Sequence, residues 1–156
     1  MSAPAKGWLR AVLVLAAVLI ADQVSKALVR AHLAIGDENA VFPGLTLVHV
    51  RNRGVAFSAL EGRTGIVTAV IALAVLALVA WFARHAARPL VWLPVGLLAG
   101  GAAGNILDRA RHGAVTDFLK LPAWPAFNVA DMAITIGVLA LLYVVERSER
   151  PRAPAG

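Results

Sequence analysis

Four apolar segments alternate with polar ones along the chain. As helices, segments of roughly 20 residues are long enough to cross a hydrocarbon core about 30 Å thick. We place them near residues 8–29, 65–83, 90–107 and 129–145. The pattern predicts an α-helical integral membrane protein with four transmembrane helices. Composition agrees, since 60% of the 156 residues are hydrophobic and the mean hydropathy is +0.75. We expect one membrane-embedded domain over residues 1–156.

The first apolar segment has two interpretations. Lys6 and Arg10 precede an apolar run at residues 11–21, which is also the outline of a cleavable signal peptide. No small-residue cleavage site directly follows the run, and the segment continues to Val29. We therefore expect an uncleaved helix that spans the membrane.

The longest polar segment, residues 30–64, predicts a small β-sheet. Residues 45–50 and 55–58 have strand-like patterns and flank a tight segment that contains Asn52 and Gly54. We expect the two strands to form a sheet on the membrane surface. Asn52 and Gly54 have two interpretations: turn formation alone, or an amide that points to a reaction centre beside a glycine that lets the backbone approach closely.

Two features predict how the helices pack. The turn at residues 84–89 is so short that the second and third helices must be antiparallel neighbours. The third helix carries Gly96, Gly100 and Gly104 at intervals of four, a spacing that lets membrane helices approach closely.

The distribution of basic residues suggests how the chain is oriented in the membrane and does not suggest a nucleic-acid partner. The net charge is +6, but the Lys and Arg residues are scattered among segment ends and form no stripe. The termini and the 84–89 turn hold as many of them as the two longer loops, in about half the length and close to helix ends. We expect both termini in the cytoplasm and the loops at residues 30–64 and 108–128 on the extracytoplasmic side.

Cysteine and histidine usage limits the possible chemistry. The chain has no cysteine, which excludes disulfides, thiol nucleophiles and thiolate metal sites. The histidines lie in different loops without the short spacings of a zinc helix: His32, His49, His85 and His112. We expect neither a metal nor another cofactor.

Two aspartates carry the candidate chemistry. Asp117 follows a short apolar run, and Asp131 stands just inside the fourth apolar segment. An ionised carboxylate is costly there unless it is paired, solvated or in use. Two carboxyl groups close enough to share a proton have their pKa values pushed apart, so one can act as base on a water while the other polarises a carbonyl. An aspartic protease needs this arrangement.

Other charged residues have simpler interpretations. Asp22 and Lys26 are spaced i, i+4 on one helix face, where they neutralise each other as a structural ion pair or contact a substrate or lipid headgroup. Asp108, next to Arg109, is most simply a local salt-bridge or helix-end residue.

The motifs as a set resemble those of the lipoprotein signal peptidases (signal peptidase II), membrane aspartic proteases that cut signal peptides from bacterial prolipoproteins. The motifs are DQxSK at 22–26, NRGVAFS at 52–58, GNxxDRxxxGxVxDF at 104–118 and FNxAD at 127–131. The resemblance implies that Asp117 and Asp131 are the catalytic pair. It also implies a set of residues that shape the site or bind substrate: Asp22, Lys26, Asn52, Gly54, Asn105, Arg109 and Asn128.

The resemblance further implies the substrate and the setting. The substrate would be a prolipoprotein cut before a diacylglyceryl-modified cysteine. The enzyme would lie among lipids of the bacterial cytoplasmic (inner) membrane, with a small β-sheet cradle and the active site on the extracytoplasmic side. Independently of the resemblance, we expect a monomer. One departure is the short link between the acids, residues 119–126, whose counterpart is thought to cover the active site in related enzymes. The acids can still meet if the chain reverses near Pro122 and Pro125.

The mechanism hypothesis is a pair of acids that holds one proton and positions a water. Arg109 is expected to be more structural than catalytic, because a guanidinium too near the pair would depress both pKa values. Two alternatives lack this chemistry. A proton-coupled transporter would place its acids near the bilayer midplane, and in a four-helix scaffold Asp117 and Asp131 would only cap helices.

Overall fold

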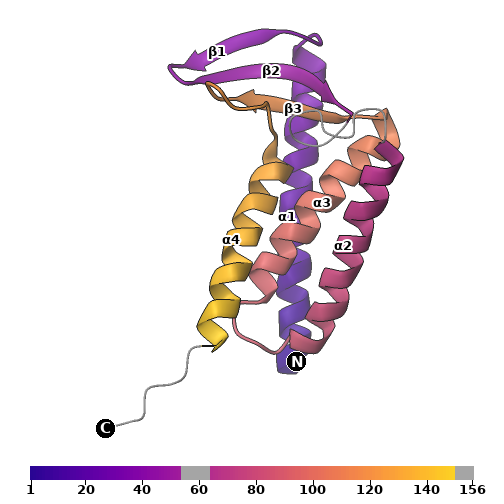
Figure 1. Ribbon diagram of the computed structural model, residues 1–156, viewed down its shortest axis with the longest axis vertical. Helices are drawn as coiled ribbons and strands as arrows, with labels where there is room; N and C mark the ends of the chain where they lie inside the picture. The colour runs from indigo at the N-terminus through magenta and orange to yellow at the C-terminus, as the bar shows by residue number, and fades with distance from the viewer. Residues whose placement is uncertain (54–63, 150–156) are drawn as a thin grey trace.

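The computed structural model describes residues 1–53 and 64–149. Figure 1 shows four long helices side by side, with a small sheet across one end of the bundle. The helices are α1 (Ala3–His32), α2 (Thr64–His85), α3 (Trp92–His112) and α4 (Val129–Glu149). The strands are β1 (Glu38–Phe42), β2 (Leu45–Asn52) and β3 (Val115–Lys120). The fold is thus a helical membrane protein with a three-stranded antiparallel sheet.

Three helices of the described ranges are long and apolar enough to cross a membrane: Ala3–His32, Gly65–His85 and Val129–Arg147. Their outward faces are apolar, and Leu13, Leu73 and Leu139 are each about 60% exposed or more. Apolar side chains exposed around a bundle suit contact with lipid tails, so the chain is an integral membrane protein. Helix α3 is more buried than the other helices, and its buried residues include the polar side chains of Asn105, Asp108 and Arg109.

Helix α3 packs against the other three helices. A Cβ atom added at Gly96 would lie 2.7 Å from the carbonyl oxygen of Ala11, and one added at Gly100 would lie 2.9 Å from that of Leu15. The predicted role of these glycines in close helix packing is confirmed, and their partner is α1. At its end α3 stops at Gly113, whose φ of 70° is left-handed.

The sheet differs from the predicted one in its strands. β2 covers the predicted strand at 45–50, and it pairs with β1 on one side and β3 on the other. The second predicted strand, residues 55–58, lies outside the described residues. β1 and β3 were not predicted, because the residues of β1 are all exposed and β3 buries four residues in succession, so neither alternates.

The predicted helix boundaries were too short at most ends. Ser2 caps α1, because its hydroxyl accepts a hydrogen bond from the amide of Ala5. α3 extends past residue 107 through polar residues that find buried partners, described below. Hydropathy alone ends a segment where charges begin, and a helix continues wherever those charges are paired or exposed.

Candidate active site

The two candidate acids come from different elements that meet beneath the sheet. Asp117 lies on β3, opposite Val50 of β2. Asp131 lies in the first turn of α4. The reversal predicted between them is present, because Phe127 forms a bridge with Leu119 and brings the chain back along β3. The short link therefore closes without separating the acids.

Asn128 joins the two acids. Its side-chain Nδ2 donates to Asp117 Oδ1 at 2.7 Å, and its backbone amide donates to Asp131 Oδ2 at 3.1 Å. The amide of Asp131 donates in return to Asn128 Oδ1 at 3.0 Å. These reciprocal bonds are a capping box at the start of α4. One asparagine thus starts the helix and connects the carboxylates that lie on either side of it.

Two further amides complete the contacts of the carboxylates. Asn52 Nδ2 donates to Asp117 Oδ2 at 3.0 Å, and Asn105 Nδ2 donates to Asp131 Oδ1 at 2.8 Å. Every carboxylate oxygen of the pair therefore accepts a hydrogen bond from a neutral amide. Neutral donors orient a carboxylate without adding the positive charge that would hold both acids ionised. Gly54 lies outside the described residues.

The surroundings of Asp117 favour its protonated form. Burial raises the pKa of Asp117 from the usual 3.8 to about 7, and the charge of Asp131 adds to the rise. Hydrogen bonds from Asn52 and Asn128, and the charge of Lys26, act in the opposite direction. A carboxyl group with a pKa near neutrality can hold or release a proton at working pH, as general acid–base catalysis requires.

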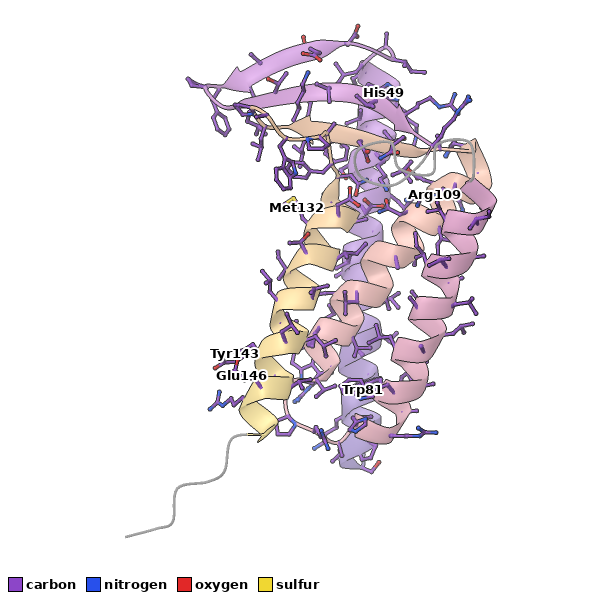
Figure 2. The ribbon with its side chains drawn as sticks, viewed as in Figure 1. His49, Trp81, Arg109, Met132, Tyr143 and Glu146 are labelled. Atoms are coloured by element: carbon purple, nitrogen blue, oxygen red, sulfur yellow. The ribbon has the colours of Figure 1, made fainter. Side chains whose placement is uncertain are left out.

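Arg109 lies at the sheet end of α3 (Figure 2) and is 9% exposed. Its Nη1 donates to the backbone carbonyl of Asn105 at 3.4 Å. The guanidinium thus contacts the turn that presents Asn105, whose side chain holds Asp131. The expectation that Arg109 is structural stays a prediction.

Asp22 and Lys26 form the predicted ion pair, with 2.9 Å between Nζ and Oδ2, and both side chains are completely buried. Asp108 also lies 3.4 Å from Lys26 Nζ and is completely buried. Of the two roles predicted for Asp108, local salt-bridge or helix-end residue, the salt bridge is present, but its partner Lys26 lies on another helix. Gln23, whose Nε2 donates to both Asp22 and Asp108, was not predicted. Spacing along one helix predicts the Asp22–Lys26 pair, whereas the contact of Asp108 depends on how α1 and α3 pack.

Histidines and acids do not gather as metal ligands in residues 1–53 and 64–149. The Nδ1 atoms of three histidines lie within 2.9 Å of a backbone carbonyl: His32, His49 and His85. These rings therefore occupy ordinary polar positions.

A helical membrane protein that holds a buried and a half-buried aspartate close together at one end of its bundle, each hydrogen-bonded by neutral amides, has the construction of a membrane aspartic protease. The sequence matches the family described as Signal peptidase (SPase) II over residues 14–146. The chain therefore belongs to the signal peptidase II family and is an enzyme of that membrane protease class.

Individual relatives agree along nearly their whole lengths. The chain is 41% identical to a lipoprotein signal peptidase of Syntrophomonas wolfei, over 85% of this chain and 93% of the relative. It is 39% identical to one of Moorella thermoacetica, over 88% and 94%. A solved bacterial membrane enzyme is similar in structure with a TM-score of 0.85 and 29% identity, covering 93% of this chain and 94% of that one. Another has a TM-score of 0.79 and 32% identity.

Proposed function

We propose that this protein removes signal peptides from diacylglyceryl-modified bacterial prolipoproteins, cutting before the modified cysteine with a water activated by Asp117 and Asp131. The observation that carries the proposal is the connection of the buried carboxylate of Asp117 to the half-buried carboxylate of Asp131 through Asn128, with an amide at each oxygen. The family membership and the names of the relatives support the substrate class. The whole chain would act as a single, monomeric peptidase domain.

The reaction follows from a pair of acids that holds one proton. The ionised carboxylate takes a proton from water as the oxygen attacks the scissile carbonyl, and the protonated one donates toward the developing oxyanion. Collapse of the tetrahedral intermediate then breaks the C–N bond. The leaving amine takes a proton from the acid that had accepted one from water, and the other carboxylate takes a proton back from a hydroxyl of the intermediate, so the pair again holds one proton. No covalent intermediate is formed. Asn52, Asn105 and Asn128 orient the carboxyl groups throughout.

The proposed orientation puts the sheet and both acids on the extracytoplasmic side of the cytoplasmic membrane, with both termini in the cytoplasm. Aromatic residues at the far end of the bundle support a membrane interface there. Trp8 stacks edge-on against Phe82 with ring centroids 4.7 Å apart, and Arg10 lies over Trp92 at 5.6 Å. Figure 2 shows Trp81 at that end, opposite Arg109. A site at the outer boundary suits a bond next to a lipid anchored in that leaflet.

The alternatives predict other geometry. A proton-coupled transporter needs acids near the bilayer midplane, whereas Asp117 is on the sheet and Asp131 is in the first turn of α4. The scaffold alternative has one observation in its favour, since Asp131 does cap its helix. It gives no reason, however, for the burial of Asp117 beside it.

The test is cleavage of a lipid-modified prolipoprotein by the purified protein in detergent. Asp117→Asn and Asp131→Asn keep the side-chain size and remove the ionisable group, and each should lower kcat on the order of 10²–10⁴-fold or more. Glu38→Gln is the matched control, because Glu38 forms an exposed ion pair with Lys120 on the same sheet. Thermal unfolding shows whether each variant is folded. Near-normal cleavage by a folded Asp131→Asn variant would contradict the proposal and favour the scaffold alternative.

A further inference from the structure

Two completely buried aspartates, Asp22 and Asp108, lie on the helix-bundle side of Asp117 and Asp131 and accept hydrogen bonds from the backbone beside them. Asp22 Oδ1 accepts a hydrogen bond from the amide of Ala130 at 3.0 Å. Asp108 Oδ2 accepts one from the amide of Thr116 at 2.9 Å. Ala130 and Thr116 are the residues immediately before Asp131 and Asp117. Each acid of the candidate pair is therefore held through the backbone amide of the residue that precedes it.

Lys26 connects the two rear aspartates. Its ammonium lies 2.9 Å from Asp22 Oδ2 and 3.4 Å from Asp108 Oδ2, and all three side chains are 0% exposed. The same ammonium donates to Asn105 Oδ1 at 2.9 Å. Because Lys26 occupies the oxygen of this amide, the NH₂ group of Asn105 must point the other way, toward Asp131. A single cation thus contacts three side chains that hold the two acids or the residues before them: Asp22, Asp108 and Asn105.

The charges of this region balance. Asp22 and Asp108 are opposed by Lys26 and by Arg30, whose Nη1 lies 3.7 Å from Asp108 Oδ1 and donates to the hydroxyl of Thr116 at 3.1 Å. Removing one member of a buried, paired set leaves an uncompensated charge. Charge balance therefore favours keeping these four groups in contact, and the hydrogen bonds of Asp108 and Asp22 hold the amides of Thr116 and Ala130.

We propose that the cluster of Asp22, Lys26 and Asp108 is a positioning device that sets the separation of Asp117 and Asp131. It rests on the proposed function, since it assumes that Asp117 and Asp131 carry out the chemistry. Its members do not contact substrate and are positioning residues. A reacting group misplaced by about 1 Å can lose on the order of 10²-fold in rate, so a disturbed cluster lowers kcat while substrate binding is kept.

Gly104 offers a way to disturb the cluster without changing any of its charges. A Cβ atom added there would collide with Asp22 Oδ2. Gly100, one turn earlier on the same face of α3, would instead meet the backbone of Leu15 and the side chain of Val18. Gly104→Ala and Gly100→Ala therefore add the same methyl group to the same helix interface, and only one of them displaces a member of the cluster.

The experiment measures kcat, KM and thermal stability for both variants with a lipid-modified prolipoprotein. Gly104→Ala should lower kcat by about 10-fold or more with KM within about twofold. Gly100→Ala should lose thermal stability but keep kcat. Equal kcat values for Gly104→Ala and wild type would overturn the proposal, and so would equal losses in the two variants, because general packing would then explain them.

A charge-balance test uses a different readout. Lys26→Met leaves the two rear aspartates against Arg30 alone and should lower kcat on the order of 10²-fold. Adding Asp108→Asn restores the balance and keeps an oxygen to accept from Thr116, so the double variant should recover part of kcat instead of losing more. Additive losses would contradict the proposal.

The variants Asp117→Asn and Asp131→Asn are measured alongside the cluster variants to separate the two proposals. If Asp117→Asn and Asp131→Asn retain activity, the proposed function is wrong. If they lose activity but the cluster variants retain it, only the positioning role is wrong.

Discussion

Asp117 is the residue whose protonation should be visible in the pH dependence of the enzyme. Its pKa is raised to about 7 by burial and by the charge of Asp131. If the active pair holds one proton, loss of the proton from Asp117 leaves both acids ionised and the pair inactive. We expect kcat/KM to fall as pH rises through about 7, measured as a pH profile of cleavage.

The raised pKa of Asp117 also affects folding stability. Its contribution is fully present below pH 3.8 and is lost as the pH rises through about 7.

A substitution at Asn52 tests whether Asp117 is the group that titrates. The hydrogen bond from Asn52 to Asp117 lowers the pKa of that acid, so Asn52→Ala should move the alkaline limb of the profile to higher pH. Glu38→Gln, on the exposed ion pair of the sheet, should leave the limb in place. An alkaline limb that moves to lower pH in Asn52→Ala would show that another group titrates there.

Residue roles could be predicted from sequence where the partner is near in the chain or where burial itself is the signal. Asp117 and Asp131 were singled out because acids beside apolar segments need a reason. Asp108 was predicted only as a local salt-bridge or helix-end residue, because its partners are Lys26, on another helix, and the amide of Thr116, beyond the end of α3. Its importance depends on packing between α1, α3 and β3, which no local pattern expresses.

Gly113 is the residue on which the junction of two elements depends. It ends α3 in the left-handed conformation, and β3 begins two residues later. Nothing lies within 4 Å of a Cβ added there, so Gly113→Ala meets only a backbone penalty. We expect the free energy of unfolding to fall by about 1–2 kcal/mol, measured by unfolding in detergent. Gly65→Ala, at an equally open position in α2 with no positive φ, should cause no loss, and equal effects of the two would contradict this explanation.

Helices were more predictable than strands in this chain. Long apolar segments indicate α1, α2 and α4 directly. β3 was hidden because four of its residues in succession are buried (Val115, Thr116, Asp117 and Phe118), so its pattern does not alternate between exposed and buried positions. Its strand conformation is stabilised by pairing with β2, which is more than 60 residues earlier in the chain. The periodicity of one segment does not show that it pairs with a strand so far away in the chain.

At the scale of the whole molecule, the candidate acids and three of the four tryptophans lie at opposite ends. The sheet and the acids lie at one end (Figure 1), and three tryptophans lie near the other, where α1 begins: Trp8, Trp92 and Trp81, the last labelled in Figure 2. Tryptophans are enriched where a helix leaves the membrane, and arginines beside them favour the cytoplasmic side. The substrate would then reach the acids from the outer leaflet.

This orientation can be measured because the chain has no cysteine, so the unmodified protein gives no background with thiol reagents. Asn39 lies exposed on the edge strand β1, and Ala87 lies exposed in the turn between α2 and α3. In spheroplasts, a thiol reagent that cannot cross membranes should label Asn39→Cys directly, and should label Ala87→Cys only after the membrane is permeabilised. Both variants should retain cleavage activity, since neither residue contacts the acids. The reverse labelling would place the sheet in the cytoplasm, where the acids could not reach a bond beside a lipid anchored in the outer leaflet.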